Sequence, residues 1–387
     1  MGTEASNPVE LFAGSPRSRT VQRLRQWISE GLFDTFPSEH SLAARLGVSR
    51  TTVRAAIRQL ETEGVIRSEG GNRVFMSPRR SRSLLEDTVA VLSLPTSVTI
   101  SASGKPNLES AIQMAIIDRL KTQSIHTLCI CADRLTPSTI QQWATEHPKG
   151  MLALRDALEA PDGQSLLSAM HQLGVPIVAY GDAPSLGAYD TLVSDHESGA
   201  YQLTRRLIEL GYKRITRFWQ RARLDGPRPE WLAQRDAGYT RAIREAGVEY
   251  REAIECGAIA TSDGSKSKFE MATQLSTGQL LPALKGSSPA DAIMCISDGI
   301  YGPVAAAIRG FGKTPNQDIA IAGYDNSWDE LVERKWEDSQ PMLTIDKSNN
   351  QIGRALAELL LNRINRSLPP EPQHLSLAPT LIDRSGR

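Results

Sequence analysis

The chain has 387 residues, of which 40% are hydrophobic and 23% are charged, with 44 basic and 44 acidic side chains. A chain of this length is expected to form two or three domains with a sizeable core, and its apolar fraction excludes a wholly disordered protein. No apolar run approaches the ~18 residues of a membrane span. Residues 1–10 lack the basic-then-apolar pattern of an export signal, so we expect a cytoplasmic protein.

The zero net charge hides an uneven distribution along the chain. Residues 1–82 hold 13 arginines, no lysine and 8 acidic residues, a surplus of five positive charges. The rest of the chain carries the matching surplus of negative charge. A small arginine-rich unit before a large acidic body is a pattern expected of nucleic-acid-binding proteins.

Three helices are predicted in the N-terminal unit. Apolar residues recur at helical spacing over residues 21–32, which indicates an amphipathic first helix. The second helix is predicted to begin after the N-cap Ser38 and to end at Gly47. The third is predicted to begin after the N-cap Ser49 and to stop at Gly64. Two helices joined by so tight a turn form a helix-turn-helix.

The third helix carries a stripe of positive charge. Arg50, Arg54 and Arg58 follow one another at a spacing of four residues, with Thr51 and Thr52 beside them at the N-terminal end. Like charges at this spacing cost an isolated helix about 0.2–0.5 kcal/mol per pair, a cost that a polyanion would remove. An arginine fork also fits the two acceptors on a guanine edge. We therefore predict that this helix contacts DNA.

The alternative for this stripe is a solvated helix face. In that case Arg58 is expected to pair with Glu61 or Glu63. The tight helix-turn-helix before the stripe favours DNA contact over this alternative.

A wing is predicted after the third helix. Residues 65–75 form two short strands about a turn at Gly70, Gly71 and Asn72. The glycines allow the backbone to approach a groove closely. Arg73 is placed to contact phosphate or to enter the minor groove.

The run FPSEHSLAARLGVSRTTVRAAIRQLETEGVIRSEGGNRVF resembles the winged-helix domain of GntR-family transcription regulators along its whole length, which sets the domain at residues 16–76. This resemblance implies a set of operator contacts, namely Arg50, Thr51, Thr52, Arg54 and the wing tip at Gly70 and Gly71. The family usually has arginine where this chain has His40. A contact from that position is therefore expected to be weaker, pH-dependent or absent.

Residues 77–87 are predicted to be a linker. They have no apolar period and contain a proline and three arginines. Two interpretations stay open: a hinge that becomes ordered against DNA phosphate, or a soluble tether.

Short apolar runs alternate with helix-length segments over residues 88–387. The predicted strands are Val89–Leu94, Leu128–Ala132, Met151–Leu154, Pro176–Tyr180, Leu192–Ser194, Ile215–Trp219, Ala292–Ile296 and Ile319–Gly323. The predicted helices include Ala111–Leu120, Leu166–Leu173, Gly199–Leu210 and Ala233–Ala246. Such alternation indicates βαβ units, and the length indicates two lobes of doubly wound α/β structure. A ligand is expected between the lobes, at the carboxyl ends of the strands.

Polar residues that directly follow the predicted strands are the candidates for ligand binding. They are Asp182, Asp195, Ser297, Asp298 and Asp325, together with Arg235 near the start of a helix. Asp195 and Asp298 are more simply explained as N-caps of the following helices. Asp325 and Arg235 are suited to bind vicinal hydroxyls, and Arg235 to bind a carboxylate or phosphate bidentately.

A second resemblance covers residues 176–387. The segments GVPIVAYGD, VSDHESGAYQLTRRLIELGYKRI, RDAGYTRAIREAGV, AIMCISDGIYGPVAAAIRGFG, IAIAGYDNS and PMLTIDKSNNQIGRALAELLLNRI resemble, in order and spacing, the LacI/GalR effector domain, which is similar to periplasmic sugar-binding proteins. The resemblance implies that Arg235 and Asp325 line the effector cleft. It also implies that the helix at 199–210 belongs to the amino-terminal lobe, with crossovers near residues 212 and 345.

Three positions in this region bear on the ligand. Ser297 stands where the family usually has asparagine, and Lys347 where it often has glutamine, so hydrogen bonding to the ligand is expected to differ. A basic Lys347 beside Arg235 points to an anionic or acidic-sugar effector. Trp328 is expected in the core rather than stacked on a sugar.

The two resemblances together imply a bacterial transcription repressor. It is expected to bind operator DNA as a homodimer and to respond allosterically to a sugar, polyol or sugar acid. Whether the ligand releases DNA or promotes its binding is left open, as is an activator or co-repressor response to a non-sugar or anionic ligand. A sugar-metabolising enzyme is a remote alternative, because the sequence has no phosphate loop and no nucleophile or metal motif. An exported solute-binding protein is likewise disfavoured.

No cofactor or metal is expected. The six histidines are scattered, and the four cysteines lack zinc-site spacing. We predict reduced and mostly buried thiols.

Overall fold

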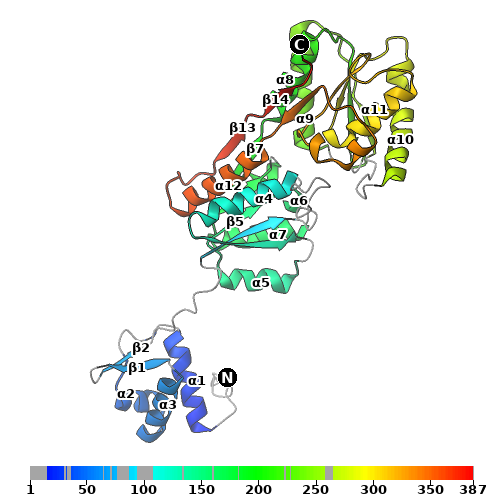
Figure 1. The fold of residues 1–387 in the computed structure, drawn as a ribbon. Helices are drawn as coiled ribbons and strands as arrows, with labels where there is room; N and C mark the ends of the chain where they lie inside the picture. The colour runs from blue at the N-terminus through cyan, green and yellow to red at the C-terminus, as the bar shows by residue number, and fades with distance from the viewer. Residues whose placement is uncertain are drawn as a thin grey trace, which may run out of the picture. The chain divides into compact units, whose positions relative to one another are not determined.

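The computed structural model divides into two compact units, residues 1–84 and residues 85–387. It describes residues 15–29, 32, 36–63, 65–69, 72–75, 87–93, 108–132, 135–158, 161–181, 183–221, 224–226, 228–257 and 265–386. Figure 1 shows the helices and strands of each unit, which are taken in turn below.

The first unit is a three-helix domain with a hairpin. It contains α1 (Pro16–Ser29), α2 (Glu39–Leu46), α3 (Arg50–Thr62), β1 (Ile66–Glu69) and β2 (Asn72–Phe75). The two predicted N-caps are confirmed, because the side chain of Ser38 accepts from the Ser41 amide and that of Ser49 from the Thr52 amide. Gly47 ends α2 with a φ of 66°, which glycine adopts without strain. Apolar residues of all three helices form one buried core.

The antiparallel hairpin of the first unit is also confirmed, with Glu69 opposite Asn72. This register places Asn72 at the start of β2, whereas the sequence placed it in the turn. Gly70 and Gly71 lie outside the described residues.

The second unit contains two sheets, each at the centre of a lobe. The first sheet has the order β13-β7-β6-β5-β3-β4 and is parallel throughout. Its strands are β3 (Thr88–Ser93), β4 (His126–Cys131), β5 (Gly150–Ala153), β6 (Ile177–Tyr180), β7 (Asp190–Ser194) and β13 (His374–Leu377). Its helices are α4 (Leu108–Lys121), α5 (Pro137–Glu146), α6 (Arg155–Leu158), α7 (Pro161–Gln172) and α12 (Asn349–Ile364). Two apolar clusters, one on each face, bury this first lobe's sheet.

The second lobe has the sheet order β14-β12-β11-β10-β8-β9, in which β14 alone is antiparallel to its neighbour. Its strands are β8 (Ile215–Arg221), β9 (Ile254–Gly257), β10 (Ala292–Cys295), β11 (Ala320–Ala322), β12 (Leu343–Asp346) and β14 (Thr380–Asp383). Its helices are α8 (His196–Glu209), α9 (Glu230–Ala246), α10 (Lys266–Lys285) and α11 (Tyr301–Gly310). The doubly wound, two-lobed α/β fold predicted from the sequence is therefore confirmed.

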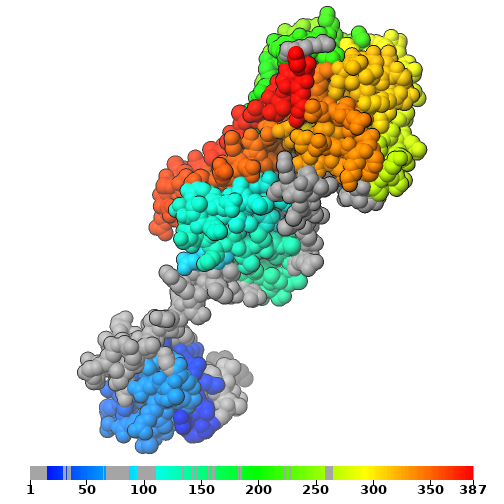
Figure 2. Space-filling model, in the orientation of Figure 1, coloured from blue at the N-terminus to red at the C-terminus, as the bar shows by residue number. Residues whose placement is uncertain are grey.

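The chain passes between the lobes three times, after β7, after β12 and after β13. The prediction that the helix at 199–210 belongs to the amino-terminal lobe is wrong. This helix, α8, packs on α9, and Leu203 and Leu207 lie in the core of the second lobe. The first crossover is therefore at Asp195 rather than near 212, while the second falls close to the expected 345. Figure 2 shows the segments near the C-terminus, coloured orange to red, extending over both lobes.

One prediction about the cysteines needs correction. Cys256 and Cys295 are buried, but Cys129 is exposed and Cys131 is half-buried. The reason is that β4, which carries both, is the edge strand of its sheet.

Candidate functional site

The exposed face of α3 is the candidate nucleic-acid surface of the first unit. Arg50, Arg54 and Arg58 are exposed there, while Val53 and Ile57 on the opposite face are fully buried. Within the described residues, the side chains of Arg50 and Arg58 have no carboxylate partner. The expected stripe is thus present, and two of its three charges are uncompensated.

Arg54 differs from its neighbours because Glu39 of α2 holds it. Its Nε and Nη2 donate to Oε2 of Glu39 at 3.1 and 2.9 Å. This hydrogen bond raises the pKa of Arg54. The pair fixes the direction of the guanidinium while about half of its surface stays exposed.

The alternative pairing of Arg58 with Glu61 or Glu63 is not found. Glu63 instead accepts from Arg25 and from Gln59. Arg58 remains exposed.

The other predicted contacts of the first unit are placed as follows. Thr51 is exposed, whereas the Thr52 hydroxyl lies 2.8 Å from that of Ser49 and belongs to the helix cap. His40 is exposed in the first turn of α2. The structure describes only the backbone of Asn72 and Arg73, in β2.

The carboxyl ends of the strands in both sheets carry the candidate ligand residues of the second unit. In the first lobe, Tyr180 ends β6 and Arg155 follows β5. In the second lobe, Asp325 lies beyond β11 and Lys347 directly follows β12. Nη2 of Arg155 lies 3.5 Å from Nε2 of His196, the first residue of α8, so residues of the two lobes meet at this edge. We call the site that these five residues form, at the carboxyl ends of the strands, the cleft.

Arg235 is central to the cleft, as the sequence predicted. It is only 3% exposed, and its guanidinium carbon lies 3.4 Å from the centre of the Tyr324 ring. Nη1 donates to the carbonyl of Ile296 at 2.6 Å, and Nε donates to Nδ1 of His196 at 3.4 Å. Burial lowers the pKa of Arg235, and no carboxylate pairs with its guanidinium among the described residues.

Sequence reasoning missed His196 and Arg155. His196 is fully buried, and burial, followed by the charges of Arg235, Arg155 and Lys347, lowers its pKa well below the usual value. Its imidazole is therefore neutral at pH 7. The only sequence signal for His196 was its place directly after Asp195 and a strand. Because Asp195 was explained as a helix cap, the next residue was not considered.

Asp325 and Lys347 form an ion pair in the cleft, with 2.8 Å between Oδ1 and Nζ. Both side chains are mostly buried. Lys347 was expected to favour an anionic effector together with Arg235, but Asp325 neutralises its charge. Asp325 and Asn326 have φ values of 87° and 50°, the left-handed region that ordinary side chains avoid. Such backbone geometry is frequent in ligand-binding loops.

Asp298 is not the helix cap that the sequence indicated. It is fully buried. Its Oδ2 accepts from the amides of Ser327 and Trp328 at 2.9 and 3.3 Å, and its Oδ1 accepts from the Thr344 hydroxyl at 2.9 Å. Asp298 thus anchors the loop that carries Asp325. Ser297, half-buried, precedes it without a capping hydrogen bond.

The remaining predictions for this region have mixed outcomes. Asp195 is the N-cap of α8, accepting from the Ser198 amide at 2.8 Å, as expected. Trp328 is buried against Tyr301 and is a core residue, also as expected. Asp182 lies outside the described residues.

The buried Asp298 gives the second unit a pH-dependent stability. Burial raises its pKa from 3.8 to about 7, so the folded chain keeps a proton that the unfolded chain releases. The contribution of this proton to the free energy of unfolding is fully present below about pH 4 and is lost as the pH rises through 7. The total loss is on the order of 4 kcal/mol. We expect Asp298→Asn, which keeps an acceptor oxygen, to flatten the dependence of the unfolding temperature on pH between 5 and 8. An unchanged slope in this variant would contradict the assignment.

A polar cavity of about 420 Å³ adjoins Asp325. Residues of both lobes line it, including Asn326 and Asp346 from the second and Asn349 and Gln351 from the first. Its carboxylate and amide groups suit the hydroxyl groups of a small polar ligand.

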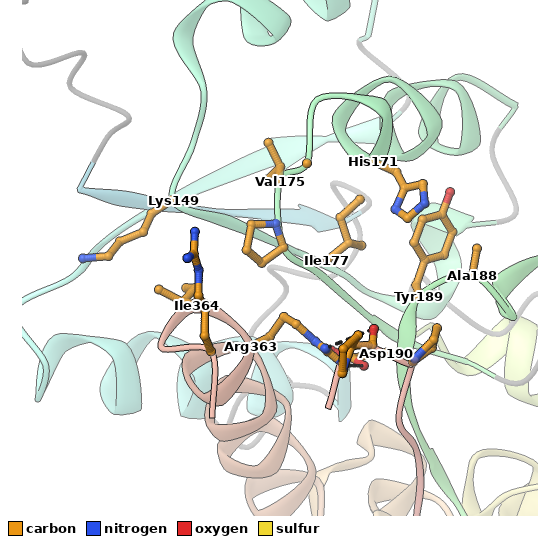
Figure 3. Close-up of a pocket in the computed structure, with 14 residues that line it drawn as sticks. Lys149, His171, Val175, Ile177, Ala188, Tyr189, Asp190, Arg363 and Ile364 are labelled. Carbon is orange, nitrogen blue, oxygen red and sulfur yellow. Dashed lines mark hydrogen bonds and ion pairs between the residues drawn. The ribbon is translucent and has the colours of Figure 1, made fainter. Parts of the chain in front are cut away.

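A second depression, of about 470 Å³, lies at the amino ends of strands β5, β6 and β7 in the first lobe (Figure 3). Its buried charge is already satisfied, because Arg363 donates to both carboxylate oxygens of Asp190 at 2.6 and 2.7 Å. The Gln373 amide also donates to Asp190. This cluster ties α12 and β13 to β7, so we regard it as structural.

The described residues offer no group of three or more metal-ligating side chains. No helix in the described ranges is long and apolar enough to cross a membrane.

Comparison with known proteins finds a matching domain family for each unit. Residues 16–76 match the family "Bacterial regulatory proteins, gntR family", and residues 204–386 match the "Periplasmic binding protein-like domain". The chain joins a GntR-type helix-turn-helix domain to a periplasmic-binding-protein-like domain. Both resemblances seen in the sequence are therefore confirmed.

The curated relatives are named as regulators and not as enzymes. The chain is 31% identical over 249 residues to the HTH-type transcriptional regulator CelR of Thermobifida fusca, covering 63% of this chain and 64% of that protein. It is 26% identical to the HTH-type transcriptional repressor PurR of Glaesserella parasuis, over 58% of this chain and 61% of the relative. With the arabinose metabolism transcriptional repressor of Geobacillus stearothermophilus it shares 23% identity over 94% of this chain and 95% of the relative.

Solved structures share the fold. A CelR–cellobiose complex matches 91% of this chain and all of that chain, with a TM-score of 0.57 and 22% identity. A LacI-family regulatory protein from Chloroflexus aggregans matches 78% of this chain and 99% of its own, with a TM-score of 0.61 and 18% identity. These matches show that the chain shares the fold of these proteins.

Proposed function

We propose that the protein is a cytoplasmic transcription repressor that binds operator DNA through α3 and its wing. The observation that carries this proposal is the exposed stripe of Arg50, Arg54 and Arg58 on a helix-turn-helix. Exposed arginines on the second helix of a helix-turn-helix, here α3, suit the major groove of DNA, where they reach guanine edges and phosphates. The regulatory names of the relatives support the same reading.

The cleft of the second unit is proposed as the site of a small carbohydrate-like effector. Asp325 lies beyond the carboxyl end of β11, and the side chain of Arg235 in α9 reaches the carbonyl of Ile296 just after β10. Two-lobed α/β proteins bind ligands at such strand ends. The arabinose repressor and the CelR–cellobiose complex among the matches support this class of ligand. Ser297, Lys347 and Asp182 complete the set that we propose.

We further propose that the repressor acts as a homodimer on a two-fold operator. The three crossovers between lobes are the segments that would bend as the lobes close on the effector. A coupling of about 1–3 kcal/mol between the sites, five- to 150-fold in affinity, is sufficient for regulation. Release of DNA by the effector is the response proposed, with a co-repressor response as the alternative.

A reciprocal pair of variants tests this scheme. Arg54→Ala removes an exposed guanidinium whose direction Glu39 fixes, so operator affinity should fall about tenfold or more. Effector binding should stay unchanged. Asp325→Asn retains the tolerance for a positive φ but loses a charge in the cleft, so effector binding should weaken while operator binding without ligand persists.

Fluorescence anisotropy with an operator fragment and calorimetry with the effector would measure the two affinities. The matched control is Arg25→Ala, which removes one positive charge of the same unit from α1, where Arg25 pairs with Glu63. Loss of both affinities in either folded variant would refute the two-site scheme.

A further inference from the structure

We propose that the effector of this regulator is an acidic sugar, whose anionic group is bound between Arg155 of the first lobe and Arg235 of the second, beside His196. The proposal rests on the function proposed above and specifies its ligand. Arg155 becomes a residue that determines specificity, a role that was not predicted from the sequence.

The imidazole of His196 cannot accept from both arginines that approach it. A neutral imidazole has one acceptor nitrogen, yet Arg155 and Arg235 approach the ring, one at each nitrogen. If Nδ1 accepts from Arg235, then Nε2 carries the proton and faces the donor group of Arg155. One of the two arginines therefore has a donor group at the ring that the imidazole cannot accept.

The positive charge of the two arginines is a second feature of this site. Lys347 is neutralised by Asp325, but neither Arg155 nor Arg235 has a carboxylate partner among the described residues. Arg155 instead lies over the Tyr180 ring, 5.1 Å from its centre, and its buried Nε has no hydrogen-bond partner. Two guanidinium groups that share a neutral histidine form a site for a bidentate anion.

Two buried hydroxyl groups lie near this pair. They belong to Tyr180 and Ser194, at the ends of adjacent strands β6 and β7, and neither has a hydrogen-bond partner among the described residues. Such groups are costly unless something bonds to them, and a ligand at this edge would do so.

The proposal places the ligand's other end toward the polar cavity beside Asp325. Asn326, Asp346 and Asn349 line that cavity with carboxylate and amide groups that suit sugar hydroxyls. A ligand with a carboxylate or phosphate at the arginines and hydroxyl groups on its other side is a uronic acid, an aldonic acid or a sugar phosphate.

The test compares charged and neutral probes of the same ring shape. D-glucuronate and D-galacturonate are titrated into the full-length protein against D-glucose and D-galactose, with D-gluconate and glucose 6-phosphate as further arms. We expect at least one acidic sugar to bind at least tenfold more tightly than its neutral counterpart. The arm that binds identifies the anionic group as carboxylate or phosphate.

Arg155→Gln should weaken binding of that acidic sugar ten- to hundredfold, with Arg155→Lys in between. The unfolding temperature of the ligand-free Arg155→Gln variant should not fall, because it removes a charge without a partner; a merely structural role would lower it. The matched control is Arg119→Gln, which removes an arginine of the same lobe that pairs with Glu358 on the surface. It should leave binding unchanged.

Equal affinity for neutral and acidic probes, unchanged binding in Arg155→Gln, or no binding of any acidic probe would overturn the inference. The proposed function is judged separately, by retention of genomic operator fragments on the full-length protein. If no fragment is retained, the regulator itself is refuted, whatever the sugars show.

Discussion

Asp236→Ala is expected to destabilise the second lobe by about 3–5 kcal/mol. Asp236 of α9 is the carboxylate partner of Arg217, which is only 1% exposed in β8. The same carboxylate accepts from the Trp219 indole at 2.9 Å and pairs with Arg228. Its removal leaves a buried guanidinium without this counter-charge, held by the Tyr250 hydroxyl, the Arg251 carbonyl and the ring of Tyr239.

Scanning calorimetry of the full-length protein would measure this loss in the transition of the second unit. The control is Glu270→Ala, which breaks an exposed pair with Lys266 on α10 and should cost less than about 0.5 kcal/mol. Similar unfolding temperatures for both variants would show that the Arg217 charge is solvated and not buried.

Gly238→Ala is expected to disrupt the contact between α8 and α9. A methyl group at position 238 would lie 2.1 Å from the carbonyl oxygen of Glu197 and 2.8 Å from the amide nitrogen of Tyr201. Both atoms belong to the backbone of α8, so the helices must move apart. Overpacking of this kind costs about 1–3 kcal/mol or more, and the shift would reach Arg235 and His196, which the two helices carry.

We therefore expect Gly238→Ala to lower both the unfolding temperature and the affinity for the effector. Gly278→Ala in α10 is the matched control, because nothing lies within 4 Å of the added methyl group. That change should be neutral or stabilising by up to about 1 kcal/mol, since alanine is the better helix former. A drop in stability in the control equal to that of Gly238→Ala would contradict the packing argument.

Both variants concern α9 because this helix carries Arg235 of the proposed effector site. Asp236 fixes it to β8, and Gly238 lets it approach α8. Arg235, adjacent to Asp236, depends on both contacts for its position over Tyr324 and beside His196. Stability and ligand recognition are therefore coupled in this helix.

The first unit could be predicted from the sequence almost completely. Its helix caps at Ser38 and Ser49, the turn at Gly47 and the arginine stripe of α3 depend on residues close together in the chain. The pairing of Arg54 with Glu39 was not predicted. It joins residues of two helices whose mutual orientation is set by the shared core.

The residues of the proposed effector site were predicted only in part, because they come from segments that are distant in the sequence. Asp325 was found from its place after a strand and Arg235 from its place near the start of a helix, and the family resemblance supported both. Arg155 and His196 were not found, since a position after a strand does not tell which residue of the other lobe lies opposite. The edge strands β13 and β14 were missed for a related reason: they are short, mostly exposed and have no continuous apolar run.

The sequence by itself determined the two units, the helix-turn-helix with its charged face, and the alternation that makes the body a two-lobed α/β fold. These depend on local periodicity, capping and charge spacing. Only the tertiary structure decided that α8 belongs to the second lobe, that Asp298 is a buried anchor and that Lys347 is neutralised by Asp325. Those outcomes depend on which residues the fold buries together. Desolvation of a side chain and its pairing with another charge are set by neighbours in space, which are often distant along the chain.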